Sequence, residues 1–265
     1  MEILNWKELL YPYEQAVAEL KVKMEYIMKE YKRFGLYCPI ESVSGRIKEP
    51  SSIIGKAKKK NIPVEKIEEE IEDIAGIRII CQFAEDIQKV ISLIRRRDGN
   101  DLKIIEERDY IENTKPSGYR SYHIIIRYPV NSVSGYREVL AEIQIRTLAM
   151  NFWAVNEHTL NYKYKGNIPP EIRERLKNCA EAAFNLDNEM STIRNEIIYA
   201  QKVNMRMDSV ISDIIDNIQN MYFKLRLSDV EKINKQFVEL WNKGDIEELE
   251  KFSAKLKEMT EPYRR

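Results

Sequence analysis

The chain has 265 residues, which is enough for one large domain or for one domain with an appendage. Lysine plus arginine and aspartate plus glutamate balance at 43 each, so no overall positive charge draws the protein onto nucleic acid. Its three cysteines lie far apart, the N-terminal residues are too polar for a secretory signal, and no apolar run approaches the length of a membrane span. We therefore expect a soluble cytoplasmic protein with reduced thiols and without a membrane or nucleic-acid partner.

The first part of the chain predicts helices. Six residues from Tyr13 to Tyr31 that are apolar or aromatic recur at alternating steps of four and three, which is typical of an amphipathic helix. A basic helix near Ser51–Lys60 and an acidic helix near Val64–Ile71 follow. Blocks of like charge are commonly solvated helix faces, and that interpretation stands here beside a functional one.

The middle of the chain changes to a period of two, which predicts β-strands. The segments with this pattern are Gly76–Gln82, Leu102–Glu107, Tyr119–Tyr128 and Arg137–Arg146. The first two are joined by a predicted helix at Glu85–Arg95, and the last two by a turn-rich hairpin connection at residues 131–135. These elements predict an α+β domain with a mixed β-sheet of about five strands flanked by helices.

The chain from Thr147 onward is predicted to be helical. Pro169 and Pro170 open a long helix in which eight residues repeat at alternating steps of four and three: Ile172, Leu176, Cys179, Ala183, Leu186, Met190, Ile193 and Ile197. This heptad seam can be buried within the monomer or can form a subunit interface, and periodicity alone favours neither. Apolar residues continue at helical spacing from Met207, so we expect residues 1–200 to form a domain and residues 201–265 a helical C-terminal extension.

One predicted strand, Val139–Arg146, has an apolar face and a polar face. Glu142, Gln144 and Arg146 point away from the apolar side chains. This pattern suggests the floor of a site, although a solvated strand face would share it. Asp73 precedes the first predicted strand, and its carboxylate could share a hard cation such as Mg²⁺ with that of Glu142 and leave positions for phosphate oxygens.

The basic segment around Pro50 complements these carboxylates. Pro50 and the serines after it resemble the start of a helix, where free backbone N–H groups favour a phosphate. Ser52, Lys56 and Lys59 share one side of this predicted helix, where they would lie along a polyphosphate chain.

A third polar segment precedes and enters the strand Tyr119–Tyr128. Tyr119, Ser121 and His123 share a strand face and would offer a nucleotide base an aromatic plane with hydrogen-bond donors beside it. A buried tyrosine and a histidine with a satisfied hydrogen bond are the ordinary alternative.

Together, four motifs resemble the synthetase domain of the RelA/SpoT superfamily, and in particular its small, RelQ-like alarmone synthetases. They are SGRIK at residues 44–48, EDIAGIR at 72–78, SGYRSYH at 117–123 and EIQIRTLAMNFWA at 142–154. Their order and spacing agree with the family from about residue 6 to residue 200. The resemblance implies a fold related to nucleotidyltransferases and a GTP/GDP pyrophosphokinase, which makes the alarmone (p)ppGpp of the stringent response by moving pyrophosphate from ATP to the 3′-hydroxyl of GDP, GTP or GMP.

The resemblance also implies roles for the residues of the ATP half of the site. Arg46 and Arg78 would sandwich the adenine. The residues that would hold the ATP phosphates are Lys48, Ser52, Lys56 and Lys59. Asp73 and Glu142 would be the catalytic pair that binds Mg²⁺, and Glu142 would also activate the acceptor hydroxyl.

For the acceptor half, the resemblance implies that Tyr119 stacks on guanine. The other contacts with the acceptor nucleotide would come from Lys115, His123, Gln144 and Asn151, with Arg108 as a further candidate for a phosphate. The family also implies a homo-oligomer, a tetramer in similar small synthetases. We expect Trp153 and His158, on the helix after the last strand, to serve packing.

Two other functions remain open at this level. Related toxin-type enzymes pyrophosphorylate the 3′ end of tRNA, which the lack of net positive charge disfavours. A non-catalytic nucleotide sensor on the same fold is disfavoured because it has no need of the paired carboxylates Asp73 and Glu142.

Overall fold

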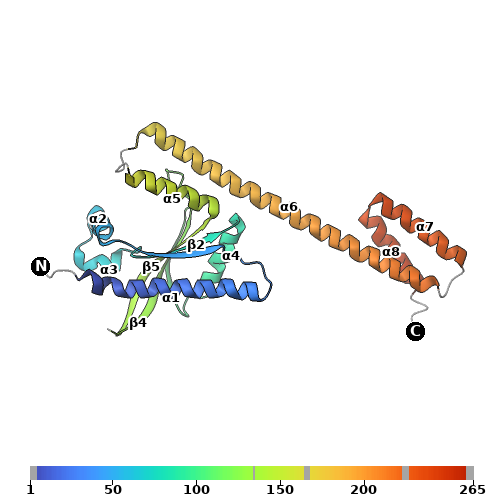
Figure 1. Ribbon diagram of the computed structural model, residues 1–265, viewed down its shortest axis with the longest axis horizontal. Helices are drawn as coiled ribbons and strands as arrows, with labels where there is room; N and C mark the ends of the chain where they lie inside the picture. The colour runs from blue at the N-terminus through green and yellow to red at the C-terminus, as the bar shows by residue number, and fades with distance from the viewer. Residues whose placement is uncertain (1–4, 134, 164–167, 223–226, 261–265) are drawn as a thin grey trace. The chain divides into compact units, whose positions relative to one another are not determined.

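The computed structural model describes residues 5–133, 135–163, 168–222 and 227–260. The chain divides into two compact units, Met1–Ser191 and Thr192–Arg265. The division falls inside one helix, α6 (Pro170–Tyr222), which runs from yellow to orange in Figure 1. Over the described ranges, no helix combines the length and the apolar character that a membrane crossing requires.

The first unit is built on a mixed sheet of five strands in the order β1-β2-β5-β4-β3. The strands are β1 (Ser42–Ile47), β2 (Ala75–Cys81), β3 (Lys103–Asp109), β4 (Tyr122–Ser132) and β5 (Gly135–Thr147). The central pair, β2 and β5, is parallel, and the other pairs are antiparallel. This arrangement confirms the predicted α+β class and the mixed sheet.

One face of the sheet is apolar and is covered by helix α1 (Trp6–Arg33). The helix buries Tyr13, Leu20 and Met24 in the same core as the isoleucines of β2, β4 and β5. The close approach requires a glycine, because a Cβ at Gly45 would lie 2.4 Å from Val17 Cγ1. Sheet and helix therefore form two packed layers.

Helix α4 (Ala84–Arg95) crosses between β2 and β3 and lies against the same face as α1. Arg95 at its end donates hydrogen bonds to Glu107 of β3 (Nε to Oε1, 3.0 Å) and to the hydroxyl of Tyr122 of β4 (3.2 Å). The side chains of Glu107 and Tyr122 belong to the apolar side of the sheet, so the polar side of β5 remains for another layer.

Helix α5 (Leu148–Lys163) follows β5 directly and lies on the other side of the sheet from α1 (Figure 1). The basic segment forms α2 (Pro50–Lys60), and the acidic one forms the short helices η1 (Val64–Lys66) and α3 (Ile67–Glu70). The basic and acidic helices predicted from the charge blocks are thus present, and both lie between β1 and β2 in the chain.

The second unit has an apolar core of its own. It consists of the C-terminal part of α6 together with α7 (Leu227–Lys243) and α8 (Ile246–Thr260). Its buried residues include Ile214, Val230, Phe252 and Leu256. Gly244 has a φ of +68° between α7 and α8, and Asp245 then caps α8 by accepting from the backbone N–H of Glu247 (2.9 Å).

The structure differs from the predicted elements in two places. The sequence analysis did not identify β1, because this edge strand has no fully buried residue and its Ser-Val-Ser-Gly-Arg-Ile sequence alternates only weakly. The strand predicted from Tyr119 begins only at Tyr122, because residues 110–121 form a loop closed by the bond from the Tyr110 N–H to the Ser121 carbonyl (3.0 Å). Of the hairpin connection, Ser134 lies outside the described residues.

Candidate active site

A cleft of about 680 Å³ opens over the polar side of the sheet, bounded by α2, by the turn before β2 and by α5. The register of the strands builds its floor. Arg78 of β2, Gln144 of β5, His123 of β4 and Arg108 of β3 lie opposite one another in one row across four strands. Side chains that are paired across neighbouring strands point to the same face, so this row is polar from end to end.

The next row on the same face, two residues nearer the N-terminal end of β5, contains Arg46, Gly76 and Glu142. Gly76 has no side chain, and a Cβ at this position would lie 3.4 Å from Arg46 Cγ. The glycine therefore leaves room for the Arg46 side chain to extend across β2 toward Glu142.

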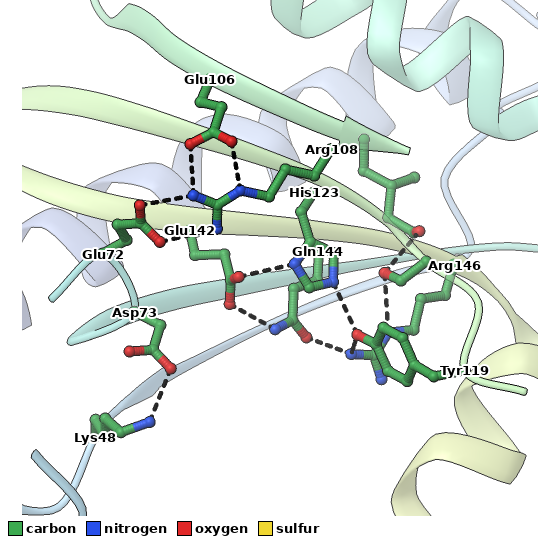
Figure 2. A network of polar contacts seen from close by, with 12 residues as sticks. Lys48, Glu72, Asp73, Glu106, Arg108, Tyr119, His123, Glu142, Gln144 and Arg146 are labelled. Atoms are coloured by element: carbon green, nitrogen blue, oxygen red, sulfur yellow. Dashed lines mark hydrogen bonds and ion pairs between the residues drawn. The ribbon is translucent and has the colours of Figure 1, made fainter. Parts of the chain in front are cut away.

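Glu142 is the buried carboxylate at the centre of the floor (Figure 2). Its Oε1 lies 2.8 Å from His123 Nδ1, and its Oε2 accepts a hydrogen bond from Gln144 Nε2 (2.6 Å). Burial acts to raise the pKa of Glu142, but its interactions with His123 and Gln144 outweigh burial and hold this pKa below its ordinary value. The carboxylate is therefore ionised at neutral pH.

Asp73 lies in the turn before β2, at the edge of the cleft. Lys48 Nζ donates to its Oδ2 (2.8 Å) and Lys56 Nζ to its Oδ1 (2.9 Å). Burial acts to raise the pKa of Asp73, but the two lysines together lower it below its ordinary value. Asp73 thus links the strand end at Lys48 to the basic helix α2.

The wall opposite α2 is aromatic. Lys115 Nζ lies 4.1 Å from the ring centre of Tyr110 and 4.8 Å from that of Tyr119. The Tyr119 hydroxyl lies 2.8 Å from His123 Nε2, and Gly118, with a φ of +87°, makes the turn that directs Tyr119 into the cleft. The predicted neighbourhood of Tyr119 and His123 is therefore present, although Tyr119 precedes the strand.

The cleft holds more positive than negative charge. Arg108 is paired with Glu72 and Glu106, but Arg78 is half-buried and its Nε has no hydrogen-bond partner in the described structure. Burial, together with repulsion by Arg146 and Arg46, lowers the pKa of Arg78. Such crowded cations favour the binding of a polyanion such as a nucleotide polyphosphate.

The carboxylates of the cleft suit a magnesium ion only in combination with a substrate. The described residues contain no cluster of three or more acidic, histidine or cysteine side chains that could hold a metal by themselves. Mg²⁺ is commonly bound by one or two carboxylates together with substrate phosphates and water. Asp73 lies near enough to Glu142 for its negative charge to act on the pKa of Glu142, which it raises. The donor set therefore fits Mg²⁺ that arrives with a polyphosphate.

The cleft brings together most of the site residues predicted from the sequence. Those that line it are Arg46, Lys56, Asp73, Arg78, Arg108, Lys115, Tyr119, His123, Glu142 and Gln144. Lys48 joins them through its bond to Asp73. Three do not line it: Ser52 and Lys59 are exposed on α2, and Asn151 is half-buried on α5 with no bonding partner for its Oδ1 within the described residues.

Comparison with known proteins identifies the family of the chain. A family model described as a region found in RelA / SpoT proteins matches residues 45–167. GTP pyrophosphokinase YjbM of Bacillus subtilis is 52% identical over 201 residues, which cover 76% of this chain and 94% of that protein. The chain belongs to the RelA/SpoT family.

Solved structures of this RelA/SpoT family are similar as well. Small alarmone synthetase 1 from Bacillus subtilis, in a crystal structure with its product pppGpp, is 52% identical to this chain and has a TM-score of 0.70, covering 72% of this chain and 97% of that one. A GTP pyrophosphokinase family protein from Streptococcus pneumoniae is 48% identical with the same TM-score, covering 75% and 97%. About a quarter of this family member thus lies outside each match.

The RelA/SpoT cleft also has lining residues that the sequence analysis did not assign to the site. The polar and aromatic ones among them are Lys60, Glu72, Tyr110, Glu157, His158 and Thr159. Arg146, expected on the polar face of its strand but without a role, lines the cleft as well. The sequence could have predicted Lys60, because it lies one helical turn after Lys56 and therefore shares its face of the helix. The packing role expected for His158 is wrong, since its side chain is exposed in the cleft, whereas Trp153 is buried and donates to the Leu176 carbonyl (2.7 Å) as expected.

Proposed function

We propose that this RelA/SpoT family member is a GTP pyrophosphokinase whose cleft moves the β,γ-pyrophosphate of ATP to the 3′-hydroxyl of GDP, GTP or GMP, forming (p)ppGpp. One observation carries the assignment: a buried, ionised carboxylate, Glu142, lies in the same cleft as three arginines, Arg46, Arg78 and Arg146, that have no carboxylate partner among the described residues. The relative crystallised with pppGpp as its product supports the choice of reaction.

In this proposal ATP occupies the side of the cleft that is bounded by β1, β2 and α2. Arg46 and Arg78 stack on the adenine, as planar guanidinium groups do on aromatic rings. Lys48 and Lys56, which now neutralise Asp73, hold the ATP phosphates in the cleft. Ser52 and Lys59, which are exposed on α2 outside the cleft lining, would contact the phosphates beyond its edge. Mg²⁺ bound by Asp73 and Glu142 would supply charge neutralisation for the phosphates and would release both lysines toward them.

The acceptor nucleotide occupies the side formed by β3, β4 and the loop before β4. Tyr119 stacks on guanine, and further contacts come from Lys115, His123, Gln144 and Asn151, with Arg108 as an additional phosphate contact. Arg108 is already held by Glu72 through two hydrogen bonds of 2.9 and 2.7 Å, so it acts with a fixed orientation.

Pyrophosphate transfer requires of the protein that it positions the two nucleotides and accepts one proton. Glu142 accepts the proton of the 3′-hydroxyl as the oxygen attacks the β-phosphorus of ATP, the bond from that phosphorus to the α-phosphate oxygen breaks, and AMP leaves. Positioning and charge neutralisation are the main contributions to phosphoryl-type transfer, which the surplus of cations in the cleft supplies.

The protein is further proposed to be a cytoplasmic homo-oligomer, a tetramer as expected from the family resemblance. In the single chain the heptad seam is open, with Leu186, Met190 and Ile197 about half exposed. A groove beside it is lined by Phe152, Trp153 and other apolar side chains of α5 and α6. An apolar surface of this kind suits a subunit interface. The proposed domain of residues 1–200 ends nine residues beyond the division of compact units, and the extension of residues 201–265 lies within the second unit.

The test is an acceptor panel. Purified protein is incubated with Mg²⁺, radiolabelled ATP and either GMP, GDP, GTP or uncharged tRNA, and the products are separated by chromatography. Label in a guanosine tetra- or pentaphosphate, or in pGpp where GMP is the acceptor, supports the proposal. Label in tRNA alone would favour the toxin-type activity, and no transfer to any acceptor despite nucleotide binding would favour a sensor.

A further inference from the structure

The floor of the cleft contains a buried arginine, Arg146, to which neither the sequence analysis nor the proposed mechanism gives a task. It follows Gln144 on the polar face of β5, and only 4% of its surface is exposed. Its Nη2 donates to Tyr119 Oη (2.7 Å) and to Gln144 Oε1 (2.5 Å), and its Nε donates to Ser121 Oγ (3.3 Å). Figure 2 shows these bonds converging on one guanidinium group.

The first branch from Arg146 fixes the Gln144 amide. Arginine can only donate hydrogen bonds, so the Gln144 atom that faces it must be the carbonyl oxygen. The amide nitrogen of Gln144 then faces the other way, where it donates to Glu142 Oε2 (2.6 Å). The ionised carboxylate, which can only accept, favours the same orientation of the amide, and Arg146 fixes the amide from its other end.

The second branch sets the direction of the bonds through Tyr119 and His123. The Tyr119 oxygen accepts from Arg146, so its own hydrogen is free to point at His123 Nε2 (2.8 Å). His123 then carries its proton on Nδ1, which donates to Glu142 Oε1 (2.8 Å). Both branches start at one guanidinium nitrogen and end on the two oxygens of one carboxylate.

We propose that Arg146 is the positioning residue of the reaction proposed above: it acts through Gln144 on one side and through Tyr119 and His123 on the other to orient the Glu142 carboxylate. The inference rests on the proposed function. Tyr119, His123 and Gln144, which the proposal assigns to the acceptor, connect Arg146 with the general base Glu142 in a closed ring of hydrogen bonds. The carboxylate of Glu142 is therefore already oriented when the acceptor nucleotide binds.

The competing role for Arg146 is direct binding of a substrate phosphate, because its side chain also lines the cleft. The geometry favours positioning, since Nη2 and Nε already donate to three protein acceptors within 3.3 Å. Among the described contacts, Arg46 donates no side-chain hydrogen bond and Arg78 Nε has no partner, so these two arginines are the more available phosphate or base contacts.

The first test reads the network without catalysis. The chain contains two histidines, His123 and His158, so long-range ¹H–¹⁵N spectra of histidine-labelled protein resolve both, and His158→Gln assigns them. We expect the wild-type His123 to be a single tautomer with its proton on Nδ1, and Arg146→Met to lose this signature. Unchanged His123 signals in folded Arg146→Met would overturn the proposal. Arg137→Met, an exposed arginine on the same strand, is the matched control.

The second test reads the reaction. Arg146→Met should lower kcat about 10²-fold, as misplacement of a reacting group typically does, with little change in the KM for ATP. Arg146→Lys keeps the charge but not the planar fork that reaches Tyr119 and Gln144 together, so it should lower kcat as well.

Other outcomes of these assays would overturn the positioning role. A raised KM for ATP with an unchanged kcat in Arg146→Met, corrected by Arg146→Lys, would assign Arg146 to phosphate binding. If wild-type protein transfers nothing to any acceptor, the proposed function fails, and the tautomer of His123 still decides whether Arg146 organises the network. Variants that do not fold are replaced by Ser121→Ala, which removes the bond to Arg146 Nε together with the bond from Ser121 Oγ to the Ile145 carbonyl (3.3 Å), and which should produce a smaller change of the same sign.

Discussion

Replacement of Glu142 by glutamine should abolish pyrophosphate transfer while leaving ATP binding largely intact. The substitution keeps the size of the side chain, and the strand around it is held by the buried Ala141 and Ile143. It removes the negative charge that the proposal assigns to proton transfer and to Mg²⁺. Loss of a general base alone lowers the rate by about 10²–10⁴-fold, and a damaged metal site adds to that.

The hydrogen bonds around Glu142 set the cost in stability. Gln144 Nε2 donates to one carboxylate oxygen, and Arg146 prevents this amide from turning, so the oxygen of the new glutamine must face Gln144. The new NH₂ group then faces His123 Nδ1, which can accept only if the histidine changes tautomer. That change places the proton on Nε2, so the Tyr119 hydroxyl hydrogen loses its acceptor. In either tautomer one donor is therefore left unpaired, and we expect a loss of about 1–3 kcal/mol.

Three measurements on Glu142→Gln check this reasoning. They are turnover with GDP, calorimetric binding of a non-hydrolysable ATP analogue, and thermal unfolding. Glu138→Gln is the matched control, because Glu138 is exposed on the same strand and bonds only to the Tyr136 hydroxyl (2.8 Å) among the described contacts. If Glu142→Gln keeps more than about a tenth of wild-type turnover, the assignment of base and metal ligand is wrong.

Three further changes test other parts of the site and the assembly. Asp73→Asn should weaken metal-dependent ATP binding as well as the rate, whereas Asp101→Asn, which removes another doubly paired carboxylate outside the cleft, should leave ATP binding unchanged. Lys48 and Lys56 lower the pKa of Asp73, so its carboxylate contributes stability that is fully present above its ordinary pKa of 3.8 and is lost as pH falls through the lowered pKa. Acid titration of unfolding measures this loss. Gly118→Ala should lower the free energy of unfolding by about 1–3 kcal/mol and raise the KM for the acceptor, because φ is +87° and the new Cβ would lie 2.7 Å from Ala180 Cβ. Gly99→Ala, with a φ of +74° and open space around it, measures the backbone strain alone. Met190→Lys in the heptad seam should dissociate the oligomer in light scattering, and Met205→Lys, at an exposed methionine of α6 outside the seam, should not; a wild-type monomer at micromolar concentration would refute the interface.

Local periodicity accounts for most of the fold. The two-residue alternation of β5 and the apolar repeat of α1 are determined by which side chains are buried, so both were predictable from sequence. Strand β1 was not, because an edge strand buries little and its glycine is explained only by the close approach of Val17 from α1.

The candidate site was predictable only in part. Glu142 and Gln144 could be assigned to the polar face of one strand from alternation alone. Their bonds could not, because the contact with His123 depends on the register of β4 against β5, which no local pattern determines. The same holds for Arg146, whose three acceptors come from β5 itself and from the loop before β4.

The central claim is that one reaction in this cleft splits ATP between its α- and β-phosphates and joins the pyrophosphate to a guanosine nucleotide. The most direct measurement follows ATP labelled at the β-phosphate in the presence of GDP and Mg²⁺, with AMP and the guanosine product quantified together. The proposal predicts equal amounts of AMP and labelled guanosine tetraphosphate, and neither with Glu142→Gln. Formation of ADP in place of AMP, or AMP without a labelled guanosine product, would contradict it.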